Sequence, residues 1–259
     1  MIAVKRLHAQ LHASAEQNLQ AVAVPPFVCY FHPTETAVFA NYAIPSQPID
    51  GNVDDALAAV IDTFRQRQCT PRFEYLQPFA PALAQILEAK GFVREMESYL
   101  MVCQPPLVRP VAVDPAVTIR LLGGAGEETA VKQAFVTVQA RAFGGDDQPA
   151  ATAESAEAFW RQFAGVGKFM AWWDGEPAGA GSLTQPHDGV AEVAGIGTLA
   201  AFRRRGIGTA VAHHITTYAF AAGLDALFLT AGDEQAGRVY AEVGFHHIGS
   251  GLAYILPTL

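Results

Sequence analysis

The chain has 259 residues, a formal net charge of −8 at pH 7, 51% hydrophobic residues and 16% charged residues. This composition supplies enough apolar side chains for a sizeable core and argues against a disordered protein. The acidic balance argues against nucleic acid as a partner. No apolar run is long enough to cross a bilayer, and polar residues interrupt any signal-peptide core near the N-terminus, so we expect no membrane partner. Three widely spaced cysteines, without zinc or disulfide spacing, favour a cytoplasmic location: Cys29, Cys69 and Cys103.

The first part of the chain, residues 1–115, alternates predicted helices and strands. We expect a helix and a Pro25-Pro26 linker in residues 1–26, and a proline-rich domain boundary at residues 104–115. The elements between them are strands at 27–31, 36–44, 72–76 and 97–103, and helices at 53–64 and 83–87. Together they predict one small α/β unit.

The second part, residues 116–259, shows a similar alternation, including a hairpin around Asp174-Gly175. The predicted strands are residues 117–121, 168–173, 177–184, 191–199, 227–230 and 247–255. The predicted helices are residues 127–143, 154–163, 207–222 and 234–243. This part therefore predicts a second α/β unit.

The most informative stretch is residues 190–218, where an apolar strand leads through an arginine and glycine loop into an amphipathic helix. The start of a helix presents unpaired N–H groups and a partial positive charge. Gly206 and Gly208 carry no side chain, so an anion can approach this backbone closely. The three arginines at residues 203–205 add local positive charge to an acidic chain. We therefore expect a binding site for a phosphate-bearing ligand here.

The pattern Arg203-x-x-Gly206-x-Gly208 after a buried strand resembles the acyl-CoA signature of the GNAT superfamily of N-acetyltransferases. Residues 169–183 are similar to the superfamily's central hairpin, and the Val-Tyr-x-x-x-Gly-Phe pattern at residues 239–245 resembles its late helix and turn. This resemblance covers about residues 116–259. It implies an α/β fold in which a mixed, largely antiparallel, twisted sheet is flanked by helices.

The resemblance also implies an acetyl-CoA-dependent N-acetyltransferase, in which a primary amine attacks directly in a ternary complex, without a metal. Glu192 then corresponds to the base and Tyr240 to the acid that protonates the leaving thiolate. Asp233 stands where the family often has an asparagine, which puts that cofactor contact in doubt. The other implied coenzyme A contacts are Ile196, Gly197, Thr198, Arg203, Arg204, Arg205, Gly206, Ile207, Gly208 and Thr209.

The two parts of the chain form an internal repeat, with matching residues roughly 150 positions apart. The Gly91-Phe92 pair matches Gly244-Phe245, and Leu76 matches Leu229. At the same offset Asp50, Gly51, Asn52 and Asp54 of the first part face Arg204, Arg205, Gly206 and Gly208 of the second, so the first part has carboxylates and no arginine there. Carboxylates beside a helix start repel phosphate. We therefore expect a degenerate GNAT-like domain at 1–115 and a catalytic domain at 116–259.

Several alternatives remain open from the sequence. Residues 143–148, Trp160, Trp172 and Trp173 fit either acceptor contacts or plain core. Glu192 also fits an ordinary ion pair, and Tyr240 also fits a packed aromatic. A non-catalytic acyl-CoA-binding sensor would share the same loop. A phosphotransferase is disfavoured because no Lys-Ser/Thr follows the last glycine. The partners expected are acetyl-CoA and an amine, with a monomer or a homodimer as the assembly.

Overall fold

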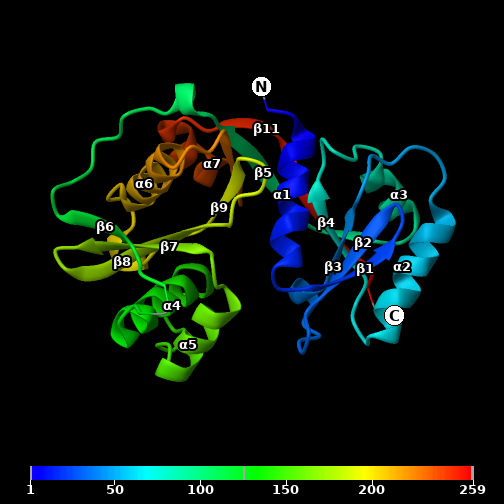
Figure 1. Cartoon of the computed structure of the whole chain (residues 1–259), viewed down its shortest axis with the longest axis horizontal. Helices are drawn as coiled ribbons and strands as arrows, with labels where there is room; N and C mark the ends of the chain where they lie inside the picture. The colour runs from blue at the N-terminus through cyan, green and yellow to red at the C-terminus, as the bar shows by residue number, and fades with distance from the viewer. Residues whose placement is uncertain (1, 125, 258–259) are drawn as a thin grey trace. The chain divides into compact units, whose positions relative to one another are not determined.

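A computed structural model describes residues 2–124 and 126–257, which divide into two compact units (Figure 1). The first unit contains the residues up to Met101, together with Thr230–Glu234 and the residues from His247 onward. The second contains Val102–Leu229 and Gln235–His246. The boundary between these units is not a single position near residue 115, because the last strand of the chain groups with the first unit. The functional division into a degenerate and a catalytic domain stays a prediction.

The first unit is a mixed sheet with helices. Its helices are α1 (Val4–Glu16), α2 (Asp54–Gln66) and α3 (Leu83–Ala89), with a 3-10 turn at Val38–Ala40. Its strands are β1 (Gln20–Val24), β2 (Phe27–Phe31), β3 (Tyr42–Pro45), β4 (Arg72–Leu76), β5 (Val93–Cys103) and β11 (His246–Ile255). They lie in the order β1-β2-β3-β4-β11-β5. β1, β2 and β3 pair antiparallel, β3 meets β4 in parallel, and β11 pairs antiparallel with β4.

Two local expectations for the first unit are corrected. Residues 20–24 form strand β1, and Pro25-Pro26 is the turn that joins β1 to β2 rather than a linker. Alternation explains this strand, because Val22 and Val24 pack against the core. The strand expected at 36–44 begins only at Tyr42. Buried Asn41 ends the preceding loop by donating to the carbonyl oxygens of residues 35 and 37, 2.9 Å each.

The core of the first unit is rich in aromatic side chains. Helix α2 buries Leu57, Val60 and Phe64 on one face. The Phe64 ring lies 4.8 Å from that of Phe31, and the Phe27 and Phe73 rings lie 5.2 Å apart. Each such ring, once removed from water, stabilises the fold by about 1.5–3 kcal/mol.

The second unit is also a mixed sheet between helices. Its strands are β6 (Val117–Leu121), β7 (Gly167–Trp173), β8 (Glu176–Leu183), β9 (Val190–Thr198) and β10 (Ala226–Ala231), in the order β10-β9-β8-β7-β6. Its helices are α4 (Thr129–Gly144), α5 (Ala153–Gln162), α6 (Ile207–Ala221) and α7 (Glu234–Val243). β6 to β9 pair antiparallel, whereas β9 and β10 are parallel. The predicted mixed sheet flanked by helices is thus confirmed in both units.

Glycines on β8 let α6 lie directly on the sheet. An added Cβ would come within 2.8 Å of Ile207 Cγ2 at Gly179, and within 2.8 Å of Val211 Cγ1 at Gly181. Between them, buried Ala180 packs with the core that contains Phe135 of α4. Figure 1 accordingly shows α6 on one side of β7 and β8, and α4 and α5 on the other. Among the helices of the described residues, none is long and apolar enough to cross a membrane.

His8 makes the stability of the first unit dependent on pH. This buried side chain stacks on Phe79 at 3.7 Å, and its Nε2 donates to the Pro45 carbonyl oxygen at 2.7 Å. Its Nδ1 has no hydrogen-bond partner among the described residues. Burial, with a smaller contribution from the neighbouring His12, lowers the pKa of His8 from 6.5 to about 4. The folded protein therefore favours the neutral form of the His8 imidazole.

We predict that the free energy of unfolding falls as the pH drops from 6.5 towards 4. In this range His8 binds a proton in the unfolded chain but stays neutral in the folded one. At pH 5 the loss from His8 is about 2 kcal/mol relative to pH 7. His8→Gln retains a donor for Pro45 but cannot titrate. Urea unfolding at pH 7 and pH 5, followed by circular dichroism, should show a smaller pH effect in this variant. An equal pH effect in both proteins would show that His8 is not responsible.

Candidate active site

Strand β9 separates from its parallel neighbour partway along its length. Residues 226–228 of β10 pair with residues 190–192 of β9, and the last pair is Phe228 with Glu192. β9 nevertheless continues to Thr198. On its other edge the register with β8 shifts, since Ala180 faces Gly197 and Ser182 faces Ala194. Gly195, with φ of +59°, lies at this bulge. Residues 195 and 196 thus leave the regular ladder with β8, whereas residues 197 and 198 remain paired with it.

Helix α4 holds this bulge in place. Gln139 Nε2 donates to the Gly195 carbonyl oxygen at 2.7 Å. A Cβ added at Gly197 would come within 2.6 Å of Ala142 Cβ, so glycine is required for α4 to lie this close. The sequence analysis missed Gln139, although Gly195-Ile196-Gly197 inside a strand is a pattern that indicates a bulge or a close backbone approach.

The loop before α6 presents bare backbone. Arg204 and Gly206 both adopt left-handed conformations, with φ of +61° and +75°, and α6 begins at Ile207. A Cβ added at Gly206 would find no atom within 4 Å. Ile207 and Thr209 turn their side chains inward, and the Thr209 hydroxyl donates to the Glu242 carboxylate at 3.2 Å. The N–H groups of the first turn and the positive end of the helix therefore remain on the open side.

The three arginines of the loop do different things. Arg203 donates from Nε to the Thr198 carbonyl oxygen and from Nη2 to that of Ala142, at 3.2 Å each. It therefore ties the loop to the end of β9 and the end of α4. The Arg205 guanidinium lies 4.8 Å from the centre of the Trp173 ring. For Arg204, which is exposed, no hydrogen bond or ion pair is seen within the described part of the chain.

Glu192 and Tyr240 both belong to the second unit. Glu192 is partly buried at the point where β9 leaves β10, and its N–H donates to Thr184 Oγ1 at 2.8 Å. Tyr240 is on α7, and burial raises the pKa of its phenol, so it is protonated at neutral pH. α7 packs beside the start of α6, since a Cβ at Gly208 would lie 3.8 Å from Val239 Cγ1. Asp233 groups with the first unit, and its contact with a cofactor stays a prediction.

The aromatic residues suggested for the acceptor separate into different environments. Trp160 is only 6% exposed and packs with Phe135, so it belongs to the core. Trp173 stacks with Arg205, and the Trp172 ring centre lies 5.6 Å from the Arg120 guanidinium. Phe143, at the end of α4, is 67% exposed. It is therefore the aromatic side chain of this group that is most available to a ligand.

A splayed and bulged strand beside a helix that begins in an Arg-x-x-Gly-x-Gly loop defines the GNAT class of acyltransferase fold. Residues 133–245, which lie in the second part of the chain, match the model of the acetyltransferase (GNAT) family. Among curated proteins, none matches the sequence.

Solved structures support the same fold over the whole chain. A GCN5-related N-acetyltransferase from Kribbella flavida is 23% identical with a TM-score of 0.82, over 100% of this chain and 97% of its own. One from Sphaerobacter thermophilus is 14% identical with a TM-score of 0.65, over 98% and 92%. A tandem GNAT protein from the clavulanic acid biosynthesis pathway is 14% identical with a TM-score of 0.62, over 90% and 79%. The tandem GNAT fold expected from the sequence is thus confirmed.

We predict that Arg203→Gln lowers the free energy of unfolding by about 1–2 kcal/mol, because two carbonyl oxygens lose a charged donor. The adjacent Arg204→Gln is the matched control and should change it by less than about 0.5 kcal/mol. Urea unfolding of the two variants measures both values. Equal effects would show that the Arg203 contacts do not fasten the loop.

Proposed function

We propose that this chain is an acetyl-CoA-dependent N-acetyltransferase that acetylates a primary amine by direct attack in a ternary complex. The observation that carries the proposal is the bulged end of β9 beside the open start of α6. GNAT proteins typically use acetyl-CoA, and the match of residues 133–245 to that family's model supports this choice of acyl donor. The family does not specify the amine.

The cofactor's diphosphate is proposed to lie on the backbone from Arg204 to Thr209. Gly206 leaves this surface free of side chains, and a helix start favours negative charge. The exposed Arg204 and Arg205 supply positive charge, whereas Arg203 acts by positioning the loop. The pantetheine arm is proposed to pair with Ile196, Gly197 and Thr198, where β9 has left β10.

The reaction forms a C–N bond and breaks the C–S bond of the thioester. The amine must first lose a proton, because an alkylammonium with a pKa near 10 is no nucleophile at pH 7. Glu192, at the point where β9 leaves β10, is proposed to accept that proton directly or through water. Tyr240 is proposed to give its proton to the departing thiolate, and its raised pKa keeps that proton in place beforehand.

The first unit is proposed to be a copy without a cofactor site. Its equivalent helix, α2, carries Asp54 and Asp55 in the first turn. The Asn52 side chain already accepts from the Asp54 N–H at 2.7 Å, and the Asp54 carboxylate lies 2.8 Å from Lys90 Nζ. A helix start disfavours phosphate when one of its N–H groups is already bonded to a preceding side chain and its first turn carries carboxylates.

We predict that Gly206→Asn weakens coenzyme A binding at least roughly tenfold, because the new side chain covers the backbone donors. Asparagine tolerates the left-handed conformation, so the fold should survive. Gly223→Asn is the matched control: it is the glycine after the other end of α6, has φ of +89°, and also has open space around an added Cβ. Calorimetric titration measures affinity, and circular dichroism checks the fold. Unchanged affinity in Gly206→Asn would overturn the proposed diphosphate site on the backbone from Arg204 to Thr209.

We predict that Tyr240→Phe lowers kcat by at least roughly a hundredfold while changing the KM for acetyl-CoA much less. Tyr218→Phe, at an exposed tyrosine of the same unit, should change neither. Release of free thiol from acetyl-CoA with a panel of amines measures turnover. If Tyr240→Phe lowers kcat and the affinity for acetyl-CoA equally, Tyr240 does not act as the general acid. Binding without thiol release by the unchanged protein, for any amine, would favour the acyl-CoA sensor instead.

A further inference from the structure

Strand β1 ends the sheet of the first unit, and its outer edge is open. All five of its residues pair with β2, from Gln20 opposite Phe31 to Val24 opposite Phe27. Within the described part of the chain, β2 is the one strand beside it, and no hydrogen bond is seen from another segment to the outer backbone groups of residues 20–24. β1 therefore presents a row of unpaired N–H and C=O groups.

The second unit has a strand at the corresponding place. From its parallel pair outward, the first unit runs β4-β3-β2-β1, and the second runs β10-β9-β8-β7-β6. The hairpins β1-β2 and β7-β8 are both antiparallel, so β1 is the counterpart of β7. On its outer side β7 pairs antiparallel with β6 over residues 117–121. Among the described residues the first unit has no counterpart of β6. The fold therefore has room for one more antiparallel strand beside β1.

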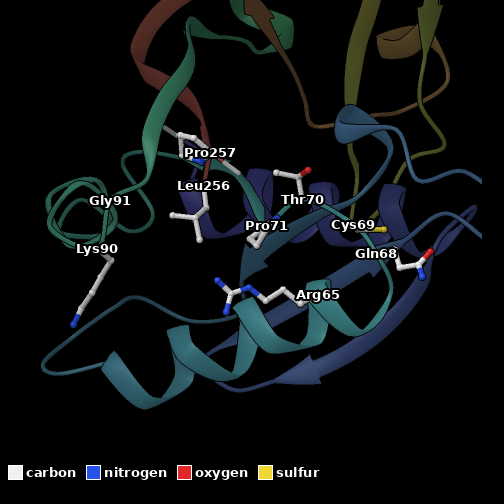
Figure 2. Close-up of a pocket in the computed structure, with 9 residues that line it drawn as sticks. All are labelled: Arg65, Gln68, Cys69, Thr70, Pro71, Lys90, Gly91, Leu256 and Pro257. Atoms are coloured by element: carbon white, nitrogen blue, oxygen red, sulfur yellow. The ribbon is translucent and has the colours of Figure 1, made fainter. Parts of the chain in front are cut away.

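The two faces of β1 differ in what covers them. Val22 and Val24 pack against the core cluster to which α2 contributes its buried side chains. Figure 2, a close-up of a hollow in this unit, shows α2 with Arg65 lying across the blue strands. The opposite face of β1 carries Ala21 and Ala23, which are both exposed. A strand added at the edge would thus extend the sheet and meet only methyl groups on this second face.

The distribution of charge along the chain favours a second copy of the chain as the added partner. Each copy has a net charge of −8, which opposes self-association. The sequence around β1 is an exception, because no Asp, Glu, Lys or Arg occurs between Glu16 and Glu35. Edge strands usually prevent pairing with a lysine, a proline or a bulge, and residues 20–24 contain none of these. Two copies can therefore approach each other along this edge without repulsion between charged side chains of the strands.

We propose that two copies of this chain associate through the outer edges of their β1 strands, which pair antiparallel about a twofold axis. Such a contact is isologous and fills both open edges at once. With the axis at Val22, Ala21 of one copy lies opposite Ala23 of the other. We expect a weak dimer, with a dissociation constant of roughly 10–100 µM, because a strand of five residues buries less than the about 1,200 Å² of a stable interface. This association is independent of the proposed acetyl transfer.

Two double variants of the full chain test this pairing by sedimentation velocity. Ala21→Lys with Ala23→Lys places like charges opposite each other across the axis, and Ala21→Glu with Ala23→Glu does the same with the opposite sign. Each should raise the dissociation constant at least roughly tenfold. An equimolar mixture of the two should form a heterodimer, because each lysine then faces a glutamate. Ala58→Lys with Ala59→Lys, at exposed alanines of α2, adds the same charge away from β1 and should leave the dimer unchanged. Circular dichroism checks the fold of every variant.

Three results would overturn the proposal. The first is that the unchanged protein stays monomeric at about 500 µM, a concentration well above the expected dissociation constant. The second is a dimer that the lysine pair on β1 weakens no more than the control pair on α2, which would place the interface elsewhere. The third is a mixture of the lysine and glutamate variants that stays monomeric, which would exclude the antiparallel register centred on Val22.

Discussion

The contact between α6 and β8 is the constraint on which the candidate site depends. Gly179 and Gly181 let the helix lie on the strand without intervening side chains, and Ile207 at the first turn is fixed against Gly179. The start of α6 is therefore held beside the last residues of β9. The exposed N–H groups at the start of α6 and the part of β9 that does not pair with β10 therefore belong to the same unit. A larger residue on β8 would move the helix start, and with it every donor of the loop, by the width of a side chain.

The comparison of the two units shows how one architecture supports opposite electrostatics. Both contain a strand that leads to a long amphipathic helix, and both end the next helix at a Gly-Phe turn. At the start of α6 the charges come from arginines, whereas at the start of α2 they come from Asp54 and Asp55. Carboxylates stabilise a helix start as well as a phosphate does. The first unit can therefore keep its fold without a ligand.

Most elements of the chain could be predicted from the sequence because their apolar residues repeat with helix or strand spacing. β1 was missed because a short alternation of alanine and valine before two prolines looks like a linker. The Arg-x-x-Gly-x-Gly loop was placed correctly between β9 and α6. The separate duties of its arginines were not predictable, since Arg203 contacts Ala142, which is 61 residues away. Such pairings depend on tertiary packing, which local patterns do not encode.

The pairing of β11 with β4 has a practical consequence for how this protein can be dissected. The final strand of the chain supplies the hydrogen-bonding partner for residues 72–76, from Gly251 opposite Leu76 to Ile255 opposite Arg72. A fragment cut near residue 115 would retain β4 but present its amide and carbonyl edge to solvent. Unpaired edges of this kind recruit other chains and promote aggregation. A circularly permuted gene that places residues 246–257 ahead of α1 is accordingly a better route to an isolated first unit than simple truncation.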